Sequence, residues 1–158
     1  MHVHVYERFW MWGAVAIIVV FLGTILFATV SLGRLPPSHV ETIDPRAVMQ
    51  DPRFAELGVT TNPDGEVTVK MIAVTFAFAP NEIRVPAGAP VTFRITSADV
   101  QHGFQIVGTN ANTMVIPGYV SQFTTVFGEP GEYLIVCNEY CGTGHHAMYG
   151  KLVVEEGQ

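Results

Sequence analysis

The sequence predicts a domain built from β-strands alone, a sandwich or a barrel, preceded by one apolar helix. Two observations lead to this prediction. A single uncharged, apolar run lies near the N-terminus, and from Glu66 onward short runs rich in β-branched and aromatic residues alternate with Gly, Pro and Asn. The second pattern is typical of all-β sandwiches and barrels. A chain of 158 residues has room for one such domain and an accessory segment.

The apolar run extends from Phe9 to Leu32 without a charged residue. About 20 apolar residues suffice to cross a bilayer core, and Trp10 and Trp12 lie at its start, where amphipathic rings favour the membrane interface. A cleaved signal peptide would have a shorter apolar region behind a basic leader, and a buried helix of a soluble protein is a third interpretation. The length favours a retained transmembrane anchor, residues 1–33.

Residues 34–65 are expected to form a connector. Two adjacent prolines in "GRLPPSHVE" favour a stiff, extended geometry. A short helix is expected next, with Asp44 as N-cap, Pro45 at the first helical position and an end before Pro52. The sequence "TTNPDGE" then indicates a turn.

The expected strands lie between Glu66 and the C-terminus. Alternation of apolar and polar residues in several of them indicates strands with one buried face. The seven runs are VTVKMIAVTFAF (67–78), EIRV (82–85), PVTFRITS (90–97), FQIV (104–107), SQFTTVF (121–127), EYLIV (132–136) and KLVVEE (151–156).

The net charge of the chain is −6. This acidic balance excludes the basic footprint of a nucleic-acid-binding protein. It fits ordinary solubility, and it also fits a docking face for a cationic protein, because complementary charge raises encounter rates.

The chemistry is concentrated in the loop "CNEYCGTGHHAM", which runs from Cys137 to Met148 and holds both cysteines of the chain. It could hold a disulfide, a zinc site or a copper site. A bridge between Cys137 and Cys141 would close a very short loop and would stabilise the fold little. A thioether is a poor ligand for zinc, whereas copper accepts thiolate, imidazole and a weak axial methionine together.

A blue-copper site uses one cysteine and two histidines, so this loop has one cysteine too many. Two thiolates four residues apart can instead bridge two copper ions, each capped by one histidine. The second histidine would be His102, in a turn after the strand at 90–97, at the corner where a sandwich would bring it beside the loop.

The pattern H…C-x3-C-x3-H-x2-M, with "DVQHGF" upstream and a closing "YGKLVVEE", resembles the binuclear CuA domain of cytochrome c oxidase subunit II over about residues 67–156. The resemblance implies a cupredoxin-like Greek-key sandwich or barrel for residues 66–158. It also implies six ligands to two copper ions. The thiolates of Cys137 and Cys141 would bridge both ions. His145 and the backbone carbonyl of Glu139 would complete one ion, and His102 and Met148 would complete the other.

The resemblance assigns further roles around the site. Asp99 would orient His102, although an Asx-turn bond without functional role is the alternative. Glu139 would reach a magnesium ion shared with subunit I, or else stay solvated. His146 falls outside the ligand pattern and is expected to be an outer residue.

A single anchor, instead of two, resembles subunit II of B-family (ba-type) haem-copper oxidases, and so does "TFAFAP" at residues 75–80. Phe76 and Phe78 are expected on the same face of a strand, either as core packing or near the electron entry patch.

The expected function is electron transfer, with no catalytic residue in this chain. The copper domain would accept electrons from a cytochrome c or a cupredoxin and pass them to haem in subunit I, which reduces oxygen. This role places the β domain on the periplasmic side of the cytoplasmic membrane and the N-terminus inside. The alternatives are a membrane-anchored copper chaperone or sensor, and the CuA domain of a nitrous oxide reductase-like system.

Overall fold

A computed structural model describes residues 4–32 and 40–156, and these belong to two separate compact units that divide after His39. The stiff connector expected after the anchor lies largely outside the described residues. The first unit is the helix α1, Val5–Leu32, which is uninterrupted and apolar throughout the predicted run. With a mean hydropathy of 2.6 over its most apolar stretch, it is long and apolar enough to cross a membrane.

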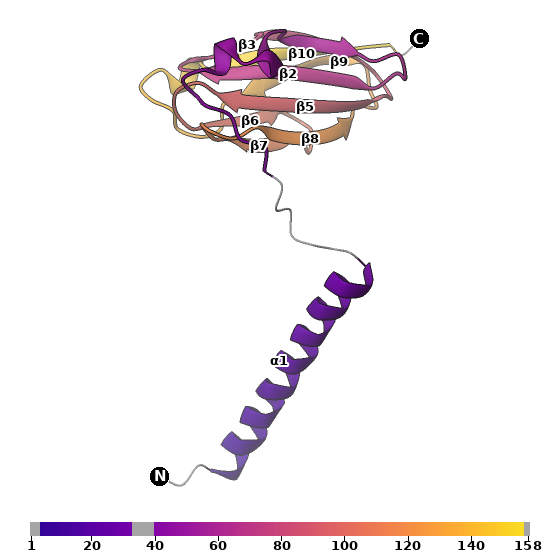
Figure 1. The fold of residues 1–158 in the computed structure, drawn as a ribbon, viewed down its shortest axis with the longest axis vertical. Helices are drawn as coiled ribbons and strands as arrows, with labels where there is room; N and C mark the ends of the chain where they lie inside the picture. Colours follow the sequence, from indigo (N-terminus) through magenta and orange to yellow (C-terminus); the bar gives the residue numbers. More distant parts are fainter. Residues whose placement is uncertain (1–3, 33–39, 157–158) are drawn as a thin grey trace. The chain divides into compact units, whose positions relative to one another are not determined.

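The second unit is a sandwich of two five-stranded sheets, seen as two layers in Figure 1. The first sheet has the order β1-β2-β5-β8, with β3 paired to β2; the strands are β1 Gly58–Thr61, β2 Val67–Val74, β3 Ala77–Ala79, β5 Pro90–Ser97 and β8 Ser121–Val126. The second has the order β4-β10-β9-β6-β7; its strands are β4 Glu82–Pro86, β6 His102–Ile106, β7 Asn112–Val115, β9 Gly131–Val136 and β10 Tyr149–Glu155. The β2–β5 and β4–β10 pairs are parallel and the others antiparallel.

Each predicted strand overlaps an observed one, and the all-β prediction is confirmed. The run at 67–78 is divided, however, because the chain turns at Thr75 and Phe76. The prediction that Phe76 and Phe78 share one strand face is therefore wrong. Phe78 is buried in the core, whereas Phe76 lies in the turn and is 37% exposed.

The core between the sheets is aromatic at its centre. Phe93 stacks on Phe123 with ring centroids 5.0 Å apart, and Phe104 meets Phe78 edge-on at 5.6 Å. Alternating side chains of both sheets complete this core. At one end it extends without interruption to Cys137 and the other sulfur-bearing residues of the predicted metal loop.

The short helix expected between Asp44 and Pro52 is reduced to a turn followed by the 3-10 helix η1, Val48–Gln50, and a second 3-10 helix, η2, spans Pro52–Phe54. Asp51 is extended, as the residue before a proline tends to be, and this ends the first helix. The Asp51 carboxylate then accepts a hydrogen bond from the backbone N–H of Arg53 at 2.9 Å and so caps the N-terminus of η2.

Residues 40–54, here called the strap, pack on the outer face of the first sheet. Ile43, Val48 and Phe54 of the strap are buried there together with Ile72 and Val120, on the side of the sheet that faces away from the core. Two backbone hydrogen bonds fasten the strap to residues 118 and 120. The strap is therefore part of the β unit, which begins at Val40.

An ion-pair network also holds the strap. The Glu41 carboxylate pairs with Arg94 of β5 and with Arg53, the latter at 2.7 Å. The Arg94 guanidinium lies 5.9 Å from the centroid of the Phe54 ring, within cation–π range. The strap is therefore held against the sheet both by ion pairs and by apolar contacts.

We expect Phe54→Ala to lower the free energy of unfolding of the fragment 40–158 by about 3 kcal/mol, because a buried aromatic ring is lost and a cavity remains. Urea denaturation would measure the difference. Met49→Ala, in the same strap but 56% exposed, is the matched control and should change it by about 0.5 kcal/mol or less. Equal effects of the two substitutions would contradict the packing described.

Candidate metal centre

The loop from Cys137 to Met148 joins β9 to β10 and projects from one end of the sandwich, in yellow in Figure 1. Cys137 directly follows β9 and Met148 directly precedes β10. The Cys137 N–H donates to the Met148 carbonyl at 3.2 Å, which continues the antiparallel pairing one step beyond the strands. The base of the loop is therefore fixed by the sheet.

His102 comes from a different part of the chain, as predicted from its place at a corner. It is the first residue of β6, the strand beside β9. Its imidazole is fully buried, and its Nδ1 lies 3.9 Å from the Cys137 Sγ. The sheet thus brings a histidine from 35 residues upstream to the base of the loop.

The two cysteines are free, with their Sγ atoms 3.8 Å apart, whereas a disulfide has sulfurs about 2.05 Å apart. The Cys137 Sγ lies 3.2 Å from the Glu139 carbonyl oxygen. The Cys141 Sγ lies 3.7 Å from the His145 Nδ1 and 3.7 Å from the Met148 Sδ. All six predicted ligand atoms are thus linked by short separations through the two sulfurs.

The 3-10 helix η3, His145–Ala147, explains the approach of His145 and Met148 to the same sulfur. In a 3-10 helix, side chains three residues apart lie on one side. His145 and Met148, which follows the helix as its C-cap, have this spacing. This spacing therefore brings both donors to the side of the loop that faces the Cys141 Sγ.

These separations fit metal ligands. Two donors about 2.0–2.3 Å from a shared ion at a tetrahedral angle lie about 3.3–3.8 Å apart. The donor atoms of His102, Cys137 and Cys141 all lie within 4.8 Å of one another. Thiolate, imidazole and thioether donors in one cluster suit copper better than zinc.

Asp99 holds the imidazole of His102 from behind. Its Oδ1 lies 2.8 Å from the His102 Nε2, and its two oxygens also accept the backbone N–H groups of Val100 and Thr75, each at 2.6 Å. Partial burial opposes ionisation of Asp99, but these hydrogen bonds outweigh it and lower its pKa to about 2. Nδ1 of His102 is left facing the sulfurs, as a metal ligand requires.

The thiol of Cys141 has a raised pKa, in contrast to the lowered pKa of Asp99. Burial, and then the neighbouring Cys137, raise its pKa to about 11. A bound cation would be needed to hold it as a thiolate at neutral pH, and binding would release the proton.

Close backbone approaches shape the loop, and sequence reasoning missed them. A Cβ on Gly103 would collide with the Asn138 side chain and lie 2.8 Å from the Glu139 N, so this glycine lets the loop rest on β6. A Cβ on Gly144 would lie 2.5 Å from the Phe76 ring. Phe76 therefore covers the loop. The sequence signals of these contacts are the glycines themselves, Gly103 for the approach of the loop to β6 and Gly144 for the approach of Phe76.

A two-sheet sandwich with a soft-donor loop at one end, preceded by an apolar helix, is a cupredoxin-like copper domain with a candidate membrane anchor. Residues 59–156 match the family model described as cytochrome c oxidase subunit II, periplasmic domain. The chain belongs to the cytochrome c oxidase subunit II family, and is thus an electron-transfer subunit of a haem-copper oxidase. The resemblance stated from the sequence is confirmed.

Relatives match over nearly the whole chain. A cytochrome c oxidase subunit 2 from Thermus thermophilus is 43% identical, over 96% of this chain and 92% of that protein. One chain in a cryo-EM structure of a heme-copper terminal oxidase dimer is 33% identical to this one. The match covers 95% of this chain and 99% of that chain, with a TM-score of 0.60. The periplasmic domain of subunit II from Bradyrhizobium japonicum, 22% identical with 56% of this chain and 83% of that chain covered, shares the fold at a TM-score of 0.53.

The Asp99 network predicts a pH dependence of stability. The folded-state pKa of Asp99 lies below its ordinary value of 3.8, so its contribution is present above about pH 4 and is lost as pH falls toward 2. The difference in unfolding free energy between the metal-free wild-type domain and Asp99→Asn should shrink by about 2 kcal/mol between pH 5 and pH 2. Chemical denaturation across this range would measure it, and a constant difference would contradict the hydrogen bonding described.

Proposed function

We propose that this chain is the single-pass subunit whose β domain holds a binuclear copper centre of the CuA type and relays electrons within the oxidase. The observation that carries the proposal is the donor cluster, in which six ligand atoms from His102 and one loop are linked by separations of 3.2–3.9 Å. Two copper ions held by the two thiolates would share one unpaired electron in the oxidised form, and would so supply one-electron transfer with small changes in bond length.

The ligand roles are those of the family pattern, and the contacts are compatible with them. Cys137 and Cys141 would bridge both ions, because their sulfurs lie 3.8 Å apart at the centre of the cluster and each is near one histidine and one weaker donor. The remaining donors would form the terminal pairs of the family pattern: His145 with the Glu139 carbonyl, and His102 with Met148.

The surrounding residues would keep this geometry unchanged when the charge of the centre changes. Asp99 fixes the ring of His102 through the 2.8 Å contact, and burial of Cys137, Cys141 and Met148 in the core limits access of water. The strands at both ends of the loop are hydrogen-bonded to each other. Little rearrangement on oxidation is what fast electron transfer requires.

The partners in this proposal are a haem-bearing subunit I in the membrane and a soluble cytochrome c or cupredoxin as donor. The helix α1 would anchor the chain with the N-terminus in the cytoplasm and the β domain outside. The match to a model described as a periplasmic domain supports this orientation. Glu139, half-buried beside the cysteines, would use its carboxylate for a magnesium ion at the contact with subunit I.

We expect two copper ions per chain in the loaded domain, and an electron paramagnetic resonance spectrum of an electron shared between two copper nuclei. Cys137→Ser and Cys141→Ser should each abolish this spectrum, because each thiolate would bridge both ions. Met148→Leu should keep both ions and shift the reduction potential, because a weak axial thioether tunes the potential more than it holds metal. Metal analysis and spectroscopy measure these outcomes.

A single copper with a localised spectrum would replace this proposal with a blue-copper one. Rapid loss of all copper to a mild chelator would favour a chaperone or sensor. Intact spectra in both serine variants would contradict the bridging role.

Glu139→Gln should leave the copper spectrum of the assembled oxidase unchanged, because residue 139 would serve copper through its backbone carbonyl. The same substitution should remove bound magnesium or a manganese substitute, which metal analysis and manganese resonance would detect. Glu132→Gln, on an exposed glutamate of β9, is the control and should retain the divalent ion. Retention of the ion in Glu139→Gln would contradict the magnesium role.

A further inference from the structure

A groove of about 410 Å³ leads from the surface of the second sheet to the donor cluster. Its outer walls include Leu134 and Tyr149, which are 50% and 60% exposed. Its inner lining includes Cys137 and Met148, which are only 6% and 2% exposed. The groove therefore connects open solvent with donors that are otherwise almost closed off.

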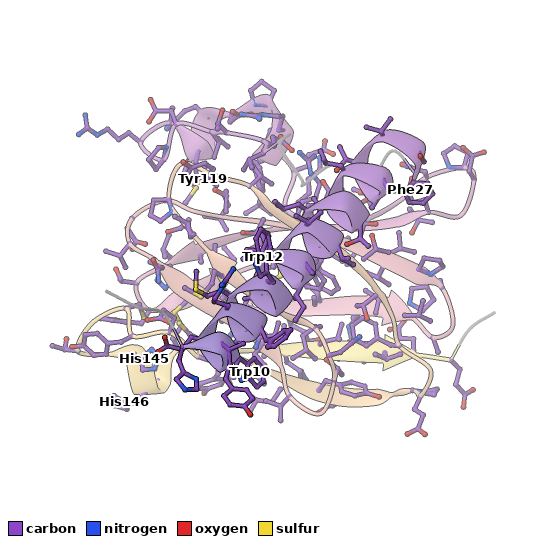
Figure 2. All side chains as sticks on the ribbon, turned by 90° about the horizontal axis from the view of Figure 1, so that it is seen from below. Trp10, Trp12, Phe27, Tyr119, His145 and His146 are labelled. Atoms are coloured by element: carbon purple, nitrogen blue, oxygen red, sulfur yellow. The ribbon has the colours of Figure 1, made fainter. Side chains whose placement is uncertain are left out.

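His146 lines this groove but has no place among the six ligands. Successive residues of a 3-10 helix point about 120° apart, so when His145 faces the Cys141 Sγ, His146 must face elsewhere. His146 is exposed, and Figure 2 shows it at the outer edge of the loop. Among the described residues its imidazole has no hydrogen-bond partner, so its ring nitrogens are available.

Two steps must accompany the binding of copper to a buried donor cluster. The thiols must lose protons to bind an ion, and an ion that enters an apolar groove must shed water. An imidazole at the rim eases the second step, because a neutral imidazole binds copper directly and replaces part of its water, and the thiols then lose their protons as they bind the ion. Once the ion is held there, ligand exchange can pass it inward to His145 and Cys137 without returning it to solvent.

We propose that this groove is the route by which copper enters the site, and that His146 is the first side chain to bind the ion. The inference rests on the proposed copper centre and adds the way in which it is loaded. The step is ligand exchange without redox change: the copper–imidazole bond of His146 breaks as bonds to the inner donors form. Each thiol that binds releases one proton to water, and Cu(I) remains Cu(I).

The test is the rate of Cu(I) transfer from a coloured chelate to the metal-free full chain in detergent, followed by loss of the chelate absorbance. His146→Gln should load several-fold more slowly than wild type and reach the same copper content. His146→Met, which restores a soft ligand at the rim, should recover most of the rate. Tyr149→Phe, which alters the groove wall without removing a ligand, is the matched control and should load at the wild-type rate.

A second variant tests the route independently. Leu134→Trp should obstruct the groove and slow loading, with unchanged final copper content. Wild-type loading rates in either His146→Gln or Leu134→Trp would overturn the proposal. Failure of the proposed function would be seen separately: a loaded wild-type chain that holds one copper, or lacks the shared-electron spectrum after partial oxidation, would refute the binuclear centre whatever the loading rates.

Discussion

The pairing register of β9 positions the donor cluster and the two strands beside it. Val136, the last residue of β9, pairs with Tyr149 of β10 on one side and with Gln105 of β6 on the other. The next residue is Cys137, and the loop, the return strand and the strand that begins with His102 are all positioned from this point. A slip of one residue would turn each side chain of β9 to the opposite face and would separate Cys137 from His102.

The centre combines two environments that seldom coexist. Its sulfurs belong to the apolar core, and burial there raises the pKa of the Cys141 thiol, so that this thiol stays protonated unless a cation replaces the proton. On the other side of the His102 ring, Asp99 stays ionised because backbone amides and His102 satisfy its oxygens. Thr75, which donates one of these bonds, is adjacent to Phe76, whose ring covers the loop. One turn of the chain thus supports the site from two sides.

Sequence reasoning identified the features that have a strong local pattern. The long alternating strands and the loop donors follow from periodicity and spacing, and His102 followed from its place at a strand corner. The short strands β1 and β7, of four residues each, lack such a pattern. The turn at Phe76 was missed because "VTFAF" reads as continuous strand, and the contact of Gly103 with the loop depends on tertiary packing that no local pattern encodes. The strap was read as part of a connector for the same reason: its buried residues match a partner sheet distant in sequence.

The strap also determines where the molecule can be cut and joined. Because Glu41, Ile43 and Phe54 belong to the β unit, the natural junction for protein engineering lies before Val40 and not at the first long strand. Attachment of a different leader at that junction, such as a thiol tag for a gold electrode or a fusion partner, would leave both buried clusters intact. The electron-carrying module could then be studied on a conducting surface in place of a lipid bilayer.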